Sequence, residues 1–321
     1  MKVGRSSAKL APSFAPHWRY TRQPLNPILT REGGFALRPI GIAGLQLDLD
    51  KGNNLDRLVA EVRLARTRLA WVDLIVLSEL AVYGPSVEFA EPERGAAEAQ
   101  FCRTARELRT WLIPGTHFTK VGDKIFNTAL VINPEGEIIA RYHKMFPWTP
   151  YEKTVSGGSE FCTFEISGIG TFGLSICYDI WFPETTRALA WRGAEILINP
   201  SLTNTIDRDV ELAIARASAA QNQMFVFYVN GAGRQGFGRS MVCGPGGEVM
   251  HAAGSGREVF ALDLDLDLAR RARERGWHGL GQPLKSFRDS EISYPQYAKG
   301  ARSEALDALG PLIMPKSREE T

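Results

Sequence analysis

One cysteine in this sequence is placed where a nucleophile would be accessible. The residues from Leu174 to Ile176 favour a strand that ends at Cys177, and Pro183 and Glu184 favour the start of a helix a few residues later. A cysteine at the carboxyl end of a buried strand, before a turn and a helix, has the geometry of a nucleophile elbow. A single cysteine is otherwise more often a small buried apolar residue, so its surroundings decide between the two interpretations.

A nucleophilic thiol needs a base or a cation nearby, because its ordinary pKa of about 8.5 keeps it protonated at neutral pH. Glu79 follows the apolar strand pattern 74–77, and Lys144 follows the strand-like segment 137–142. Functional groups in open α/β sheets gather beyond the carboxyl ends of strands, so we expect Glu79, Lys144 and Cys177 to meet there. No histidine lies in a cysteine-protease signature, which leaves a Cys–His pair possible but unsupported. The five histidines are His17, His117, His143, His251 and His278.

Glu79 and Lys144 also have ordinary interpretations. An acid such as Glu79 is favoured at a helix N-terminus, and Lys144 can be a solvated lysine at the end of a strand. Their occurrence in one chain together with Cys177, each after an apolar strand, favours a joint catalytic role.

These motifs resemble those of the nitrilase, or carbon-nitrogen hydrolase, superfamily, over about residues 38–268. The resemblance implies an α/β fold, a four-layer αββα sandwich of two mixed β-sheets flanked by helices. It implies Glu79, Lys144 and Cys177 as the catalytic set and Glu152 as a second glutamate that orients the lysine or the substrate, although Glu152 can also be a surface acid. The matching segments are Glu79 with Tyr83-Gly84, Tyr142-His143-Lys144, Cys177 to Glu184, Arg192 to Ser201, Asn230-Gly231 and Gly238-Arg239-Ser240.

The resemblance and the residues imply the same chemistry. Glu79 acts as general base, Cys177 attacks an amide carbonyl, and the Lys144 ammonium with the Tyr178 backbone N–H stabilises the oxyanion, before water hydrolyses the thioester. No cofactor is implied. The cysteines have no metal-ligand spacing, and the acidic stripe 262–268 lacks the spacing of a calcium loop, so we expect no metal. The cysteines are Cys102, Cys162, Cys177 and Cys243.

The substrate is less sharply indicated. Residues 145–152 resemble aliphatic amidases and formamidases, whereas Cys177-Tyr178-Asp179 is more similar to carbamoylases and omega-amidases. We expect hydrolysis of a small linear amide with release of ammonia, with an N-carbamoyl amine or amino acid as the alternative and a nitrile ranked lower. A catalytically silent interaction protein and an acyltransferase remain open as other classes. The expected pocket residues are Trp148, Tyr151, Tyr178, Trp181 and Phe182.

Composition limits the other classes of function. The 321 residues carry a net charge of +2, which gives no case for nucleic acid, and no apolar run is long enough for a membrane helix. Few, scattered cysteines suggest a reducing compartment, so we expect a cytoplasmic protein. Residues 1–37 read as a basic N-terminal arm, 38–268 as the hydrolase domain, and 269–321 as an aromatic, proline-marked C-terminal arm at the interface of a homodimer or higher homo-oligomer.

Periodicity predicts the elements that position these residues. The pattern of apolar, polar and turn residues indicates alternating strands and helices, followed by an acidic half-exposed strand that Asp267 caps into a helix. The expected strands are 38–47, 74–77 and 224–229, the expected helices 53–70, 96–108, 183–191 and 207–222, and the expected hairpins 131–139 and 242–250.

Overall fold

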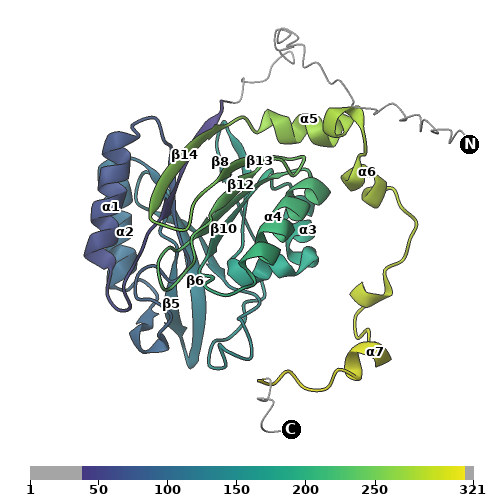
Figure 1. Cartoon of the computed structure of the whole chain (residues 1–321), viewed down its shortest axis with the longest axis horizontal. Helices are drawn as coiled ribbons and strands as arrows, with labels where there is room; N and C mark the ends of the chain where they lie inside the picture. Colours follow the sequence, from purple (N-terminus) through teal and green to yellow (C-terminus); the bar gives the residue numbers. More distant parts are fainter. Residues whose placement is uncertain (1–37, 315–321) are drawn as a thin grey trace, which may run out of the picture. The chain divides into compact units, whose positions relative to one another are not determined.

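The computed structural model describes residues 38–314, and two β-sheets lie between two pairs of helices in it (Figure 1). The predicted N-terminal arm, residues 1–37, lies outside the described residues, as do residues 315–321 of the predicted C-terminal arm. Of the residues described, no helix is both long and apolar enough to cross a membrane.

The first sheet has a parallel centre, and each side of that centre is joined to the next strand by an antiparallel pair. Its centre is formed by β1 (Ile40–Gln46), β2 (Leu74–Leu77) and β4 (Trp111–Ile113). Helices α1 (Leu55–Arg68) and α2 (Ala96–Leu108) cover its outer face through a shared apolar cluster. The remaining strands are β14 (Glu258–Leu264), which pairs with β1, and then β6 (Lys124–Ile132), β5 (Thr116–Val121), β3 (Glu91–Pro92) and β7 (Ile138–His143).

The second sheet repeats this plan with six strands. Parallel strands β9 (Gly170–Leu174), β10 (Ile196–Ser201) and β11 (Phe225–Asn230) form its centre. Helices α3 (Pro183–Trp191) and α4 (Arg208–Asn222) cover its outer face. The antiparallel strands are β8 (Cys162–Ile166), β12 (Met241–Cys243) and β13 (Val249–Ala252).

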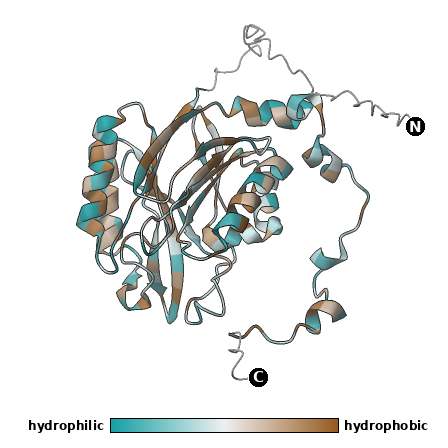
Figure 2. Cartoon of the chain, viewed as in Figure 1, coloured by the Kyte–Doolittle hydropathy of each residue, from teal (hydrophilic) through white to brown (hydrophobic). Residues whose placement is uncertain are grey.

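The inner faces of the two sheets form one apolar core. Ile42 and Val76 of the first sheet belong to the same fully buried cluster as Phe172 and Phe225 of the second. Figure 2 shows the hydrophobic residues concentrated along the strands between the helices. Strands buried on both faces need continuous apolar runs, which is why segments such as 74–77 were readable from the sequence. The predicted four-layer αββα sandwich is confirmed.

The carboxyl ends of the central strands are joined by backbone hydrogen bonds between the sheets. Glu79 N–H, just after β2, donates to Ser201 O at the end of β10 over 3.2 Å. Ala232 N–H, just after β11, donates to Leu47 O after β1 over 2.9 Å. The residues that follow these strands are therefore held at one common edge.

After β14 the chain forms α5 (Asp267–Arg275), which packs on the second sheet. Arg270 forms a salt bridge with Glu195, and Arg273 Nε donates to Gln223 O over 3.1 Å. Beyond α5, short helical segments are linked by mostly exposed chain. These segments are η3 (Trp277–Gly279), α6 (Pro283–Arg288), η4 (Pro295–Tyr297) and α7 (Glu304–Asp307).

The predicted elements match the structure closely, with one correction at the acidic stripe. Helix α2 has the predicted bounds, and both predicted hairpins form, as β6–β7 and β12–β13. The strand β14, however, ends at Leu264, and Asp267 is the first residue of α5 instead of its cap. The carboxylate of Asp265 accepts the Asp267 N–H over 3.0 Å, and the helix begins one residue earlier than predicted.

Candidate active site

Three side chains at the joined edge form a buried group. Glu79 follows β2, Lys144 follows β7, and Cys177 begins the short turn η2 (Cys177–Trp181) after β9. Lys144 Nζ donates to Glu79 Oε1 over 2.8 Å, and both side chains are at most 3% exposed. The Cys177 thiol lies close enough to the Glu79 carboxyl for the charge of one group to act on the pKa of the other. The structure therefore brings together the three residues that the sequence singled out.

The Glu79 carboxyl has a raised pKa. Burial is the main cause, and the negative charge of Glu152 adds to it, while the charge of Lys144 and hydrogen bonds from Lys144 and Cys177 lower the pKa in part. Asn127 Nδ2, from β6, donates to Glu79 Oε1 over 2.8 Å. The sequence interpretation missed Asn127, although a lone amide inside the apolar strand run was a signal that could have found it.

Lys144 remains a cation in this setting. Burial alone would lower its pKa, but the charges of Glu79, Cys177 and Glu152 raise the pKa well above its ordinary value. Glu152 Oε2 lies 3.2 Å from Lys144 Nζ and also accepts the backbone N–H of Trp148. Glu152 thus contacts the lysine and orders the segment that follows it.

The backbone at Cys177 is left-handed, with φ +45°. This conformation costs a non-glycine residue about 1–2 kcal/mol. Asn199 Oδ1 accepts the Cys177 N–H over 3.1 Å, and Asn199 Nδ2 donates to Ser175 Oγ over 2.7 Å. Asn199, which the resemblance placed only in a matching segment, therefore fixes the turn that presents the sulfur.

Asp179 connects the cysteine turn to the lysine segment. Its carboxylate accepts Ile176 N–H over 2.9 Å, Phe146 N–H over 2.8 Å and Tyr142 O–H over 2.7 Å. Burial raises the pKa of Asp179 to about 6, against the effect of these hydrogen bonds. Tyr142 and Phe146 lie on either side of Lys144 in the sequence. The Asp179 carboxylate therefore fixes the position of the cysteine turn relative to the lysine.

The thiol of Cys177 is held in its protonated form. Burial raises its pKa most, the charge of Glu79 raises it further, and Lys144 only partly offsets both. Thr203 Oγ1 lies 3.8 Å from Sγ and donates to Glu211 Oε1 over 2.9 Å. A thiol in this environment reacts only if a base removes its proton, and Glu79 is the neighbouring carboxyl that can do so.

A cavity of about 310 Å³ opens onto the thiol. Trp148, Tyr178 and Trp181 line it, as predicted. Tyr151 and Phe182 lie outside its lining, which corrects the prediction for these two: Tyr151 stacks on Trp148 and is 53% exposed, and Phe182 stacks on Phe146. The other lining residues are Cys177, Leu202, Thr203, Asn204, Thr205, Asp207 and Glu211.

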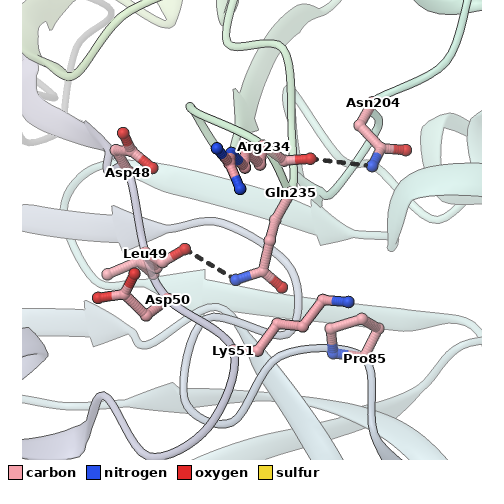
Figure 3. Close-up of a pocket in the computed structure, with 8 residues that line it drawn as sticks. All are labelled: Asp48, Leu49, Asp50, Lys51, Pro85, Asn204, Arg234 and Gln235. Atoms are coloured by element: carbon pink, nitrogen blue, oxygen red, sulfur yellow. Dashed lines mark hydrogen bonds between the residues drawn. The ribbon is translucent and has the colours of Figure 1, made fainter.

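A second, larger hollow of about 720 Å³ lies beside this cavity and shares Asn204 with it. Figure 3 shows the Gln235 amide reaching Leu49 O and the Asn204 amide reaching Arg234 O across it. It contains none of the three buried reactive groups, so the chemistry belongs to the smaller cavity. Within residues 38–314, no three His, Cys, Asp or Glu side chains are grouped as metal ligands.

Known proteins share this arrangement of elements. The chain is 27% identical to the omega-amidase NIT2 of Pongo abelii over 253 residues, which cover 74% of this chain and 91% of that protein. It is 27% identical to a formamidase of Bacillus cereus, covering 74% of this chain and 75% of the relative. The crystal structure of Saccharomyces cerevisiae Nit3, a nitrilase superfamily member, matches with a TM-score of 0.68 at 27% identity, covering 74% of this chain and 94% of that one.

The family comparison covers the whole of both sheets. The model of the family described as carbon-nitrogen hydrolase matches residues 39–274, from the start of β1 to the last turn of α5. With the fold and the buried cysteine already established, this match identifies the chain as a member of the carbon-nitrogen hydrolase family, in the nitrilase superfamily, and as a hydrolase of C–N bonds.

Proposed function

We propose that this protein is a cysteine-dependent amidase that hydrolyses a small linear amide to a carboxylic acid and ammonia through a thioester on Cys177. The observation that carries the proposal is the buried salt bridge between Glu79 and Lys144 beside the Cys177 thiol, which lines a cavity. A base, a fixed cation and a nucleophile in contact are the parts that acyl transfer requires.

In the first half of the reaction, Glu79 removes the thiol proton as Sγ attacks the amide carbonyl carbon. The Lys144 ammonium and the Tyr178 N–H donate to the developing oxyanion, since the Cys177 N–H is already engaged by Asn199. One well-placed donor of this kind lowers the barrier by about 3–4 kcal/mol. Glu79 then gives its proton to the departing nitrogen, the C–N bond breaks, and the acyl group remains on sulfur.

In the second half, water attacks the thioester carbonyl. Glu79 takes a proton from that water, the C–S bond breaks, and the proton returns to the sulfur, so the enzyme is regenerated. Glu152 positions the lysine through its contact with Nζ and does not serve as the main base. The raised pKa of Glu79 suits both directions of proton transfer, because such a carboxyl group binds a proton more readily than an ordinary carboxyl group and can still release it.

The test is a panel of short linear amides and N-carbamoyl amines, with the released products measured. Ammonia with an equal amount of carboxylic acid supports the proposal, whereas ammonia with carbon dioxide indicates the N-carbamoyl alternative. Cys177→Ala must abolish both, and rapid mixing followed by intact mass measurement must detect an acyl adduct on Cys177 in the wild-type protein. Hydrolysis that persists in Cys177→Ala would refute the proposal.

A further inference from the structure

The lining of the cavity beside the thiol is acidic and aromatic. Three aromatic rings and two carboxylates line it, and no lysine or arginine does. Asp207 stands at the N-terminal end of α4, and Glu211 follows in the first turn of that helix. The aromatic residues are Trp148, Tyr178 and Trp181.

Glu211 is set firmly in this wall. It is 3% exposed, its Oε1 accepts the Thr203 hydroxyl, and its Oε2 accepts Arg208 Nη1 over 2.9 Å. Arg208 is itself buried, lies over the Tyr228 ring and is not among the residues that line the cavity. The negative charge of Glu211 reaches the thiol, because it is among the causes that raise the Cys177 pKa.

The charges around the thiol do not balance. When ionised, the carboxylates of Glu79, Glu152, Asp179, Asp207 and Glu211 outnumber the cations Lys144 and Arg208 by five to two. Lys144 is shared by Glu79 and Glu152, and Arg208 pairs with Glu211. Asp207 also lines the cavity and forms no salt bridge with the residues that the structure describes. Charges in a site shielded from water act over longer distances than in bulk solvent, so the excess is felt across the cavity. The neighbouring hollow differs, since Asp48 and Asp50 there face Lys51 and Arg234.

We propose that the amide cleaved at Cys177 carries a positively charged group, an ammonium or a guanidinium, at the end of its acyl chain away from the scissile bond. The aromatic rings of Trp148 and Trp181 and the carboxylates of Asp207 and Glu211 receive that group. Aromatic faces attract organic cations through the negative charge distribution of the ring face. A substrate with a carboxylate at that end meets charge repulsion and no compensating cation. That such an amide is hydrolysed rests on the proposed function, whereas the preference of the cavity for a cation does not.

The preference for a cation can be measured at the thiol itself, without any amide. Methanethiosulfonates that carry an aminoethyl, a hydroxyethyl or a sulfonatoethyl group transfer that group to a thiolate and release methanesulfinate. Their rates with Cys177 at pH 7, each divided by the rate with glutathione, compare a cation, a neutral group and an anion of similar size. We expect the cationic reagent to exceed the anionic one by at least about tenfold after this correction.

Two single substitutions test which residues are responsible. Asp207→Asn is expected to reduce the ratio of cationic to anionic rates several-fold. Asp209→Asn is the matched control, because Asp209 lies on the same helix but pairs with Arg239 and is absent from the cavity lining. Equal corrected rates for the three reagents, a faster anion, or the same loss of ratio in both variants would overturn the inference.

Amides of matched shape then separate the inference from the proposed function. The set is 5-aminopentanamide as the cation, hexanamide as the neutral compound and glutaramate as the anion, and we expect kcat/KM to fall in that order. Hydrolysis without this order refutes the inference and leaves the amidase proposal intact. Charge-selective modification of Cys177 without hydrolysis of any amide supports the cation site and counts against the amidase proposal.

Discussion

Two glutamates contact Lys144, and their surroundings give them different roles. Glu79 is buried against Asn127 and the thiol, so its pKa is raised and it can exchange protons. Glu152 accepts a backbone N–H from Trp148 and stays closer to the surface, so it acts as a fixed charge. The lysine therefore stays protonated in both halves of the proposed reaction, while only one of its two acidic neighbours changes state.

This difference predicts a shift in the pH profile of Glu152→Gln. The negative charge of Glu152 raises the Glu79 pKa, so its removal lowers that pKa. Activity needs ionised Glu79 and rises as the pH passes through its pKa, so the acidic limb of kcat/KM should move to lower pH. The measurement is kcat/KM between pH 4 and 8 for the variant and the wild type. An acidic limb that stays in place or moves to higher pH would contradict the assignment of Glu79 as the base.

At the scale of elements, a close approach of two loops fixes the end of β2. Gly115 follows β4 with φ +73°, and a Cβ atom on it would lie 1.9 Å from the carbonyl oxygen of Ser78. Ser78 directly precedes the proposed base Glu79, so the position of that carboxyl depends on the absence of a side chain at residue 115.

Gly115→Ala is therefore expected to lower stability and activity together. The left-handed backbone costs about 1–2 kcal/mol, and the clash with Ser78 adds to it and displaces Glu79. Chemical denaturation and kcat measure the two effects. Gly122→Ala is the matched control, since Gly122 has φ +59° but no neighbouring atom within 4 Å of the added Cβ. It should lose stability alone, and an equal loss of kcat in the two variants would argue against the displacement.

The sequence predicted the elements better than the contacts between them. Runs such as 74–77 and 96–108 carry their own burial pattern, and Glu79, Lys144 and Cys177 were recognisable because each terminates such a strand. Asn127 was missed because its role depends on which strand pairs with β7, and apolar periodicity does not specify pairing. In the structure Lys144 N–H donates to Asn127 O over 2.9 Å, which sets the amide beside the lysine.

The residues of α4 that line the cavity could not be predicted from the sequence for a similar reason. Helix α4 was predicted, but its periodicity shows only that one face is buried, and both the core and a substrate cavity satisfy that condition. Glu211 therefore had no distinguishing mark except that it is an acid on the buried face. Tyr151 was assigned to the pocket by its place in the motif, yet the ring of Trp148 stacks on it and occupies the cavity side.

At the scale of the whole molecule, the C-terminal segment exposes many apolar side chains. Leu280, Leu306, Leu309, Leu312 and Ile313 are each at least 60% exposed, and Figure 2 shows such hydrophobic positions along the segment that includes α7. Exposed apolar residues at this density mark a surface that another chain covers. We propose that the segment packs on a second copy, in a homodimer or a larger homo-oligomer.

Mutation of this segment should change the oligomeric state. The double substitution Leu309→Ser and Leu312→Ser removes apolar contact area from the proposed interface, so light scattering after size exclusion should show a smaller mass than for the wild type. Leu64→Ser, at an exposed position on α1, is the control and should keep the wild-type mass. A wild-type protein of monomeric mass would refute the proposed assembly.

The left-handed conformation of Cys177 creates a trade-off between catalytic activity and conformational stability. Glycine adopts φ +45° without strain, so Cys177→Gly should resist denaturant better than Cys177→Ala by about 1 kcal/mol, although both lack a nucleophile. The strained backbone at Cys177 therefore costs stability, and a glycine there would remove that cost together with the nucleophile. Directed evolution for heat tolerance alone is therefore expected to discard Cys177 early, and a thermostable variant of this enzyme must be selected for turnover in the same experiment.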